Sequence, residues 1–212
     1  MSSDIIRDLN DTSLNSEQKI ELYEKWCVEY DDDLKALEGT APKRGCQAIC
    51  SYVQENREST SILDVGAGTG LLGEELYQKG FRNIEAIDPS QGMLNVAEKK
   101  NVYRKFYCNF FTSEPSNLFK SDSYDVVTSC GCFNPGHLPY DVIIEMVRIT
   151  KPGGIVCLSC RIEHLKEAPE YAKFFPLCEQ LEKEGKWKKE EVTLYDGYIK
   201  NVVGVIIVYR VL

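Results

Sequence analysis

The sequence lacks a membrane-spanning segment, a secretory signal and a recognisable set of metal ligands. No eighteen consecutive apolar residues occur, and no apolar stretch follows basic residues near the start, as in a secretory signal. We therefore expect a cytoplasmic protein. The chain has only two histidines, His137 and His164, and neither has the spacing of a zinc-finger ligand. No metal site is predicted.

The sequence also lacks an excess of basic residues. It has 25 Lys and Arg against 33 Asp and Glu, which gives a net charge of −8. A phosphate backbone would be repelled by such a chain, so nucleic acid is not an expected partner. Lysines do cluster between 183 and 189, but glutamates alternate with them. This stretch is interpreted as a solvated helix end.

The nine cysteines do not indicate a disulfide framework. Their number is odd and no secretion signal accompanies them, which is typical of reduced thiols. Cys157 and Cys160 form a C-x-x-C motif within the apolar run 155–160. Because alternate residues of a strand face opposite sides, the two thiols should point to opposite faces of a sheet. Both are predicted to be core residues.

The length of 212 residues suits a single domain, which we divide into N-terminal helices over 1–57 and a core over 58–212. One amphipathic helix is predicted from Asn15-Ser16 to Gly39, with Asp31, Asp32 and Asp33 on its far side or boundary. A second helix is predicted from Pro42 to about Gln54. The apolar face of the first helix consists of Tyr23, Trp26, Cys27, Tyr30, Leu34 and Leu37.

From residue 61 onward, short apolar runs alternate with helical patterns. The expected strands are 61–65, 84–88, 103–109, 124–129 and 155–160, and the expected helices are 71–79, 91–100 and 140–150. A helix over 169–184 and two strands over 191–195 and 202–211 complete the chain. Such alternation predicts an α/β fold: a Rossmann-like, seven-stranded, mostly parallel sheet with an antiparallel C-terminal strand pair and helices on both faces.

A glycine-rich loop follows the first of these strands. Asp64-Val-Gly66-Ala67-Gly68-Thr-Gly70 leads from a buried strand into a helix, where free backbone N–H groups and small residues let a ligand approach closely. Gly68, Gly70 and Gly73 also satisfy the dinucleotide pattern G-x-G-x-x-G. Asp64, however, suits a cationic ligand better than a pyrophosphate.

Asp88 ends the second strand and is followed by Pro89 and Ser90. Its carboxylate is placed to bond both hydroxyls of a ribose, whichever cofactor is bound. Together with the glycine-rich loop, the Lys-Pro-Gly-Gly before the fifth strand and the terminal strand pair, this motif resembles the class I S-adenosylmethionine-dependent methyltransferases. The resemblance extends from about Tyr23 to the C-terminus, and the segment 23–31 ahead of Ala41-Pro42 is similar to the Williams-Beuren-region methyltransferase-like proteins.

The resemblance implies S-adenosylmethionine as cofactor and a set of residues that bind it. Gly66 and Gly68 would border the methionine moiety, Asp88 the ribose and Met93 the adenine. Asn109 and Phe110 stand where the family usually has an acid and a small residue, so the adenine edge would meet an amide here. The N-terminal helices would cap the site. The full implied set is Tyr23, Trp26, Tyr30, Asp64, Gly66, Ala67, Gly68, Asp88, Pro89, Met93, Asn109, Phe110 and Cys130.

The loop 129–137 follows the fourth strand and is expected to face the acceptor, since open α/β sheets bind ligands at the carboxyl ends of their strands. His137 in this loop is a candidate general base, or else a surface or capping residue. A tyrosine of the N-terminal stripe, Tyr23 or Tyr30, would lie near the sulfonium, or the stripe would serve packing alone.

The reaction implied is displacement at the cofactor methyl, for which the protein must align the acceptor and exclude water. Because the chain is small and acidic, the predicted acceptor is a small molecule. Two alternatives stay open: an NAD(P)-dependent oxidoreductase that uses the overlapping glycine pattern, and a cofactor-binding protein without catalysis.

Overall fold

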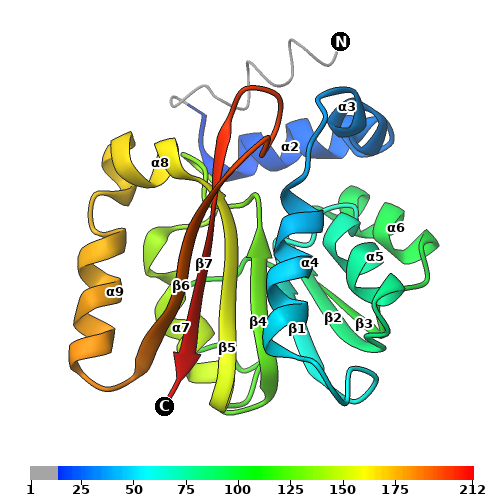
Figure 1. Cartoon of the computed structure of the whole chain (residues 1–212). Coiled ribbons are helices and arrows are strands. Elements are labelled where there is room, and N and C mark those ends of the chain that lie inside the picture. The colour runs from blue at the N-terminus through cyan, green and yellow to red at the C-terminus, as the bar shows by residue number, and fades with distance from the viewer. Residues whose placement is uncertain (1–13) are drawn as a thin grey trace.

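A seven-stranded sheet with helices on both faces forms the centre of the computed structural model, which describes residues 14–212 (Figure 1). The strand order is β3-β2-β1-β4-β5-β7-β6. The first five strands are parallel, and β7 runs antiparallel to both β5 and β6, which confirms the predicted fold. The strands are β1 (Ser61–Val65), β2 (Asn83–Asp88), β3 (Lys105–Cys108), β4 (Tyr124–Cys130), β5 (Thr150–Arg161), β6 (Trp187–Asp196) and β7 (Val203–Val211).

Two apolar cores lie on the two faces of the sheet. On one face, α4 (Ala41–Tyr52) and α5 (Leu71–Gln78) bury residues such as Ile49 and Leu76, and α6 (Gln91–Lys99) lies beside them in Figure 1. On the other face pack α7 (Ile143–Ile149), α8 (Ile162–Glu167) and α9 (Phe174–Lys183). The turns η1 (Tyr140–Val142) and η2 (Pro169–Tyr171) precede α7 and α9.

The cysteines of the C-x-x-C motif are divided between these two cores. Cys157 is buried on the α4 side and Cys160 on the α9 side, and both are free thiols. Strand alternation therefore separates them, as predicted.

The long N-terminal helix predicted over 15–39 is wrong as a single element. The structure has α2 (Ser16–Trp26) and α3 (Tyr30–Ala36), separated by a turn. Asn15 caps α2, and the three carboxylates Asp31, Asp32 and Asp33 fall in the first turn of α3, where they oppose the positive end of the helix dipole. This acidic run favours a new helix start, which the apolar periodicity did not show.

The predicted helix over 169–184 also divides, into η2 and α9. Pro176 has no backbone N–H and is tolerated only in the first turn of an α-helix, so α9 begins at Phe174. The lysine-rich stretch 183–189 begins at the end of α9, as predicted for Lys183, but it continues into β6, which starts at Trp187. The Trp187 ring is fully buried and stacks on Tyr209 with 3.9 Å between ring centroids, which draws this segment into the sheet.

Helices α2 and α3, hereafter the cap, lie across the carboxyl ends of the parallel strands (Figure 1). The turn between β6 and β7 holds the segment that joins the cap to α4. The Thr40 amide donates to the Tyr198 carbonyl at 3.0 Å, and the Lys200 amide donates to the Leu37 carbonyl at 2.9 Å. Within residues 14–212, no helix is long and apolar enough to cross a membrane.

Candidate cofactor and acceptor site

A cavity of about 660 Å³ lies between the cap and the carboxyl ends of the parallel strands. It collects segments that are more than one hundred residues apart in the sequence. Every residue that the sequence singled out for the site lines this one cavity: Tyr23, Trp26, Tyr30, Asp64, Gly66, Ala67, Gly68, Asp88, Pro89, Met93, Asn109, Phe110, Cys130 and His137.

The glycine-rich loop between β1 and α5 forms the floor of the cavity. Gly66 has a φ of 70°, and a Cβ atom there would lie 2.3 Å from the Cys132 sulfur, so only glycine fits. Gly68 has a φ of 55°, and nothing lies within 4 Å of the position a Cβ would take. The backbone at Gly68 is therefore open to a ligand in the cavity.

Gly73, the last glycine of the apparent dinucleotide pattern, serves a different purpose. A Cβ on Gly73 would lie 2.3 Å from Cζ of Tyr103, whose hydroxyl donates a hydrogen bond to Asp64 at 2.7 Å. The glycine makes room for this tyrosine beneath the loop. Sequence reasoning missed Tyr103, which is 39 residues from its partner and belongs to no motif.

Two carboxyl groups line this part of the cavity, the buried Asp64 and the half-buried Asp88. Burial raises the pKa of Asp64 to about 7, although the hydrogen bond from Tyr103 opposes the shift. Burial raises the pKa of Asp88 to about 6, against two backbone bonds that it accepts at 2.9 Å from the Gly68 and Ser90 amides. Because burial disfavours their charged forms, a cationic ligand would stabilise both carboxylates.

Polar contacts fasten the cap to the floor of the cavity. Glu24 of α2 accepts hydrogen bonds from the Ser90 hydroxyl at 2.7 Å and from the Gly92 amide at 2.9 Å. In α3, Asp31 accepts a bond from the Thr69 hydroxyl and pairs with Lys100 at 2.6 Å. The sequence analysis placed Asp31 on the far side or boundary of its helix, but the break between α2 and α3 turns it toward the loop. No pattern in the sequence predicted the contacts of Glu24 or of Asp31.

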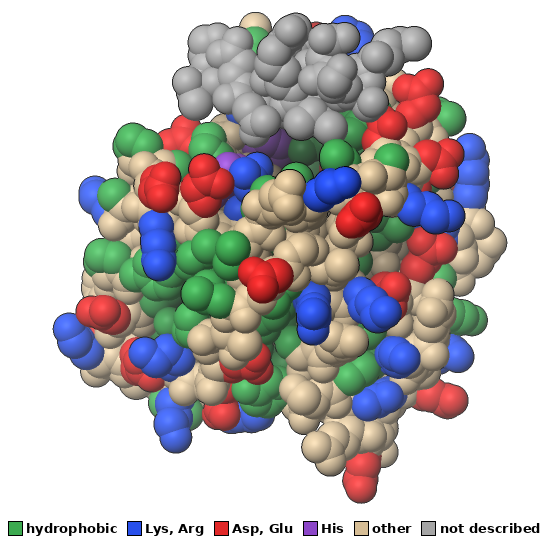
Figure 2. Space-filling view, turned by 45° about the horizontal axis from the view of Figure 1, so that its top comes forward, with side chains coloured by type: hydrophobic (Ala, Val, Ile, Leu, Met, Phe, Trp, Pro, Cys, Tyr) green, Lys and Arg blue, Asp and Glu red, His purple; other side chains and the backbone are tan. Residues whose placement is uncertain are grey.

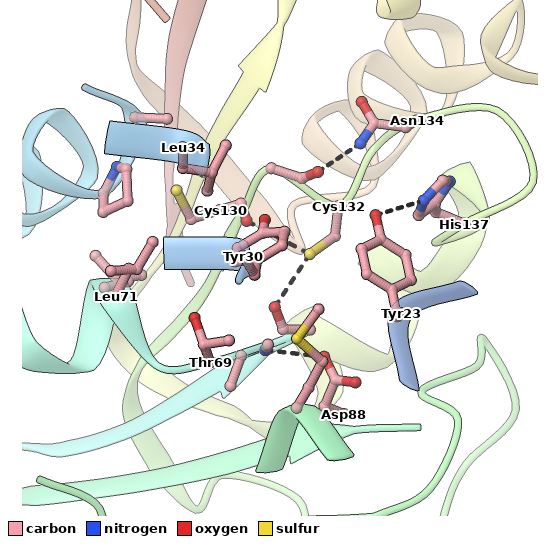
Figure 3. Close-up of a pocket in the computed structure, with 18 of the residues that line it drawn as sticks. Tyr23, Tyr30, Leu34, Thr69, Leu71, Asp88, Cys130, Cys132, Asn134 and His137 are labelled. Carbon is pink, nitrogen blue, oxygen red and sulfur yellow. Dashed lines mark hydrogen bonds between the residues drawn. The ribbon is translucent and has the colours of Figure 1, made fainter. Parts of the chain in front are cut away.

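An aromatic group closes the cavity from the cap side. The rings of Tyr23, Trp26 and Tyr30 contact one another. The Trp26 centroid lies 6.2 Å from that of Tyr23 and 4.7 Å from that of Tyr30, and the two tyrosine centroids are 6.3 Å apart. The Tyr23 hydroxyl points to His137 and lies 2.8 Å from its Nε2 atom (Figure 3). His137 Nδ1 lies 2.9 Å from the Pro135 carbonyl, which can only accept, so Nδ1 carries the proton and Nε2 accepts from Tyr23. Burial lowers the pKa of His137 to about 4, and the ring is neutral at neutral pH.

Comparison with known proteins identifies the family. A family model described as a methyltransferase domain matches residues 63–158. Methyltransferase-like protein 27 of Homo sapiens is 32% identical over 175 residues, which cover 81% of this chain and 69% of that protein. The chain belongs to the class I S-adenosylmethionine-dependent methyltransferases.

Other methyltransferases resemble parts of the chain or its fold. Demethylmenaquinone methyltransferase of Renibacterium salmoninarum is 38% identical over 94 residues, which cover 44% of this chain and 38% of that protein. A TehB-like SAM-dependent methyltransferase from Corynebacterium glutamicum has the same fold, with a TM-score of 0.62 and 15% identity over 90% of this chain and 98% of that one. A putative RNA methyltransferase from Pyrococcus horikoshii has a TM-score of 0.57 and 15% identity, over 81% and 82% of the two chains.

The cavity of this methyltransferase fits S-adenosylmethionine. The cofactor carries a sulfonium, an ammonium and one carboxylate, so it needs negative groups near its methionine end. The cavity has two carboxyl groups of this kind, Asp64 and Asp88, and the open face of Gly68 leaves room for a ligand to approach the backbone. Each Asp88 oxygen accepts one backbone bond and retains a lone pair for a ribose hydroxyl.

The residues predicted to meet the adenine lie at the rim formed by β2, β3 and α6. Met93 is buried on α6, so packing in the core and contact with a ligand are compatible roles. Asn109 follows β3 and is exposed, and Phe110 is 47% exposed. The Asn109 amide donates to the Asp88 carbonyl at 3.2 Å, which holds the start of this loop beside the predicted ribose site.

The methyltransferase has further cavity residues that the sequence analysis did not select. Arg161 ends β5 and His164 follows in α8, and both line the same cavity. His164 Nδ1 lies 2.8 Å from Oδ1 of Asn134, whose amide donates to the Gly131 carbonyl at 2.6 Å. The predicted strand 155–160 ends one residue before Arg161. The sequence therefore gave no indication that Arg161 and His164 line the cavity.

Proposed function

We propose that this methyltransferase transfers the methyl group of S-adenosylmethionine to a small-molecule acceptor held between the cap and the loop after β4. The observation that supports this is the closed arrangement of the site, in which cap, glycine-rich loop and acceptor loop line one cavity. When bound, the cofactor supplies an electrophilic methyl group on a sulfonium. The protein then aligns the acceptor with that methyl and keeps water out.

Each residue that lines the cavity is assigned to the part of the cofactor that its chemistry suits. We assign the ribose hydroxyls to Asp88, the ammonium side of the methionine moiety to Asp64, and the methionine backbone contacts to the loop from Gly66 to Gly68. Tyr30 and Trp26 offer aromatic faces to the sulfonium, an arrangement that attracts cations. The remaining contacts are assigned to Pro89, Met93, Asn109 and Phe110 around the adenine, and to Ala67 and Cys130 near the methionine moiety.

Tyr23 and His137 are assigned to the acceptor. In the neutral His137, Nε2 already accepts the hydrogen bond from the Tyr23 hydroxyl. The proton of the methyl acceptor would pass to the Tyr23 oxygen as the Tyr23 proton moves to Nε2. Loss of that proton makes an oxygen or nitrogen of the acceptor a better nucleophile for the methyl group. The pair therefore acts as a general base rather than as a nucleophile.

Size and charge support a small acceptor. The cavity volume lies within the range of about 300 to 1,000 Å³ that is typical of small-molecule sites. On the face shown in Figure 2, Lys and Arg are scattered among Asp and Glu without a continuous basic surface. One relative, demethylmenaquinone methyltransferase, is named for a small molecule.

We further propose that residues 1–212 work as one domain, with 1–57 forming the cap and α4 and 58–212 the Rossmann-like core. We propose the cytoplasm as its compartment, where the thiols stay reduced. All nine cysteines are free in the structure, which supports this.

The decisive experiment supplies the purified protein with isotope-labelled S-adenosylmethionine and, separately, a small-molecule extract, total RNA and a protein extract. Label should enter the small-molecule fraction, and mass spectrometry would then identify the product. Transfer to RNA or protein alone would contradict the proposed acceptor class. Cofactor binding without transfer to any of the three would favour the non-catalytic alternative.

A further inference from the structure

We propose that the methyl acceptor carries an oxyanion, a carboxylate or a phosphate, and that Arg161 binds it. This inference rests on the proposed function, because it concerns the acceptor half of the same cavity. It adds the chemical class of the acceptor and a residue that recognises it.

Charged residues are distributed unevenly around the cavity. Among residues 14–212, all the acidic residues that line it come from α3, β1, β2 and α5: Asp31, Asp32, Asp64, Glu74, Glu75 and Asp88. No Asp or Glu lines it along 130–139 or 161–164, where Arg161, His137 and His164 do. Lys19 of α2 is buried at the same side and donates to the Pro135 carbonyl at 2.6 Å. Lys35 of α3 and Lys43 of α4 also line the cavity, and Glu170, which does not line it, accepts from the Gly136 amide at 3.1 Å. The side formed by 130–139 and 161–164 is therefore distinguished by having no carboxylate in its lining, which suits an anion.

The Arg161 guanidinium has few partners within the protein. Its Nε atom is buried and has no hydrogen-bond partner among the described residues. Its only ion pair in that part of the chain joins Nη2 to Glu163 at 3.2 Å, and the Glu163 side chain is 56% exposed. A buried donor without a partner is unfavourable. The Arg161 side chain as a whole is 21% exposed and lines the cavity, so a small shift of the guanidinium toward a ligand oxygen would satisfy this donor. A guanidinium offers parallel N–H bonds that match the two oxygens of a carboxylate or phosphate.

The residues beside Arg161, His164 and Asn134, are not available to bind an oxyanion. Burial and the Arg161 charge both lower the pKa of His164, so its ring does not provide a second positive charge. Asn134 has its oxygen turned to His164 and its amide to the Gly131 carbonyl, so it is already engaged. Arg161 is therefore the charged donor of this corner.

The two ends of the acceptor would then be fixed by different residues. An oxyanion at Arg161 sets the orientation of the molecule, and the nucleophilic atom lies toward Tyr23 and His137, on the same side of the cavity. Methyl transfer forms the new bond to that atom and breaks the bond between methyl and sulfur, while the displaced proton goes to the Tyr23–His137 pair. S-adenosylhomocysteine leaves as the neutral thioether.

The test uses a small-molecule extract separated on an anion exchanger at pH 7.5 into retained and unretained fractions. With labelled S-adenosylmethionine, the protein should methylate a component of the retained fraction. Arg161→Gln should lower that transfer about 10- to 100-fold, the range for losing a charge-assisted bond, and Arg161→Lys should restore part of it. Prior phosphatase treatment of the fraction removes the acceptor if its anion is a phosphate ester and leaves it if the anion is a carboxylate.

The matched control is Arg210→Gln, which removes a guanidinium that pairs with Glu190 at the other end of the sheet. It should transfer methyl groups as the unaltered protein does, and calorimetric titration should show the same S-adenosylmethionine affinity for all variants. Label only in the unretained fraction, or unchanged transfer by Arg161→Gln, would overturn the inference and leave the proposed function intact. Label in neither fraction would overturn the proposed function, and the inference with it.

Discussion

The hydroxyl of Tyr23 donates a hydrogen bond to Nε2 of His137 across 2.8 Å. The bond joins the cap to the loop after β4, so the two walls of the proposed acceptor site hold each other in place. Burial, in turn, removes the ordinary pH response of the histidine, because it lowers the His137 pKa to about 4. Between pH 6 and 9 the pair should keep one arrangement of protons.

This pair gives the first prediction. Tyr23→Phe keeps the ring but removes the hydroxyl, so methyl transfer should fall on the order of 100-fold, the scale of losing general base catalysis. Calorimetric titration should show S-adenosylmethionine affinity within about twofold of the original, since the aromatic face remains. Tyr77→Phe, on the exposed side of α5, is the control. Equal loss of cofactor binding and transfer would show that Tyr23 serves the cofactor instead.

The second prediction concerns pH. Asp64 and Asp88 have pKa values of about 7 and 6 in the folded protein, above their ordinary value of 3.8. The folded state therefore binds more protons than the unfolded state between these values, and this part of the stability is lost as pH rises from about 4 to 7. Urea unfolding without cofactor should show lower stability at pH 8 than at pH 5, and Asp64→Asn should reduce the difference.

The same carboxyl groups predict the opposite trend for cofactor binding. The cation favours their ionised forms, so S-adenosylmethionine affinity should increase from pH 5 to pH 8 and binding should release protons. Calorimetry in buffers of different ionisation enthalpy measures that release. A flat affinity profile across this range would contradict the placement of the cation beside these residues.

Asp88 itself supports the third prediction. Asp88→Ala removes the proposed ribose contacts and the bonds from the Gly68 and Ser90 amides, so S-adenosylmethionine should bind about 1 to 3 kcal/mol more weakly. Asp196→Ala, at the exposed end of β6, should leave the dissociation constant unchanged. An unaltered constant for Asp88→Ala would remove this residue from the site.

The fourth prediction concerns Gly73, the last glycine of the apparent dinucleotide pattern. A methyl group at Gly73 collides with the Tyr103 ring, so Gly73→Ala should destabilise the protein by roughly 1 to 3 kcal/mol, as overpacking does. Gly45→Ala in α4 meets only ordinary contacts at 3.6 and 3.7 Å and should stabilise it by roughly 0.5 to 1 kcal/mol. Thermal unfolding of the two variants should therefore shift in opposite directions.

The fifth prediction concerns the attachment of the cap. Glu24→Gln weakens the bonds to Ser90 and Gly92, so the cap should open more often and S-adenosylmethionine should dissociate several-fold faster. Glu21→Gln lies on the exposed side of the same helix and is the control. Stopped-flow dissociation and hydrogen exchange over 16–36 measure the effect. If both variants behave alike, Glu24 does not hold the cap closed.

The sheet and most strands were predictable because their signals are local. Ser61–Val65 combines an apolar run with a glycine-rich turn, and β1 has those bounds. The break in the N-terminal helix was not predictable from periodicity, since both halves continue a three- or four-residue repeat. The acidic run 31–33 is a local signal for a new helix start, but the contacts of Asp31 with Thr69 and Lys100, which lie far along the chain, had none.

The residues of the candidate site also divide into those that a motif predicts and those that it does not. Asp64, Asp88 and the loop glycines stand at fixed spacings, and the structure brings them into one cavity. No sequence motif includes Tyr103, Glu24 or Arg161. The order of the strands and the position of the cap bring these residues to the site. Their contribution depends on contacts across the fold, which a single sequence does not express as a motif.

The turn between β6 and β7 has a consequence for the order in which the protein folds. Thr40, at the end of the cap, bonds Gly197, which lies 157 residues later. Contacts between residues so distant in sequence are slow to form, because the whole intervening chain must first be arranged. During synthesis, the cap therefore lacks this anchorage until β6 and the turn have emerged. The protein should gain tight cofactor binding as one of the last steps of folding, and C-terminally truncated chains should not acquire it.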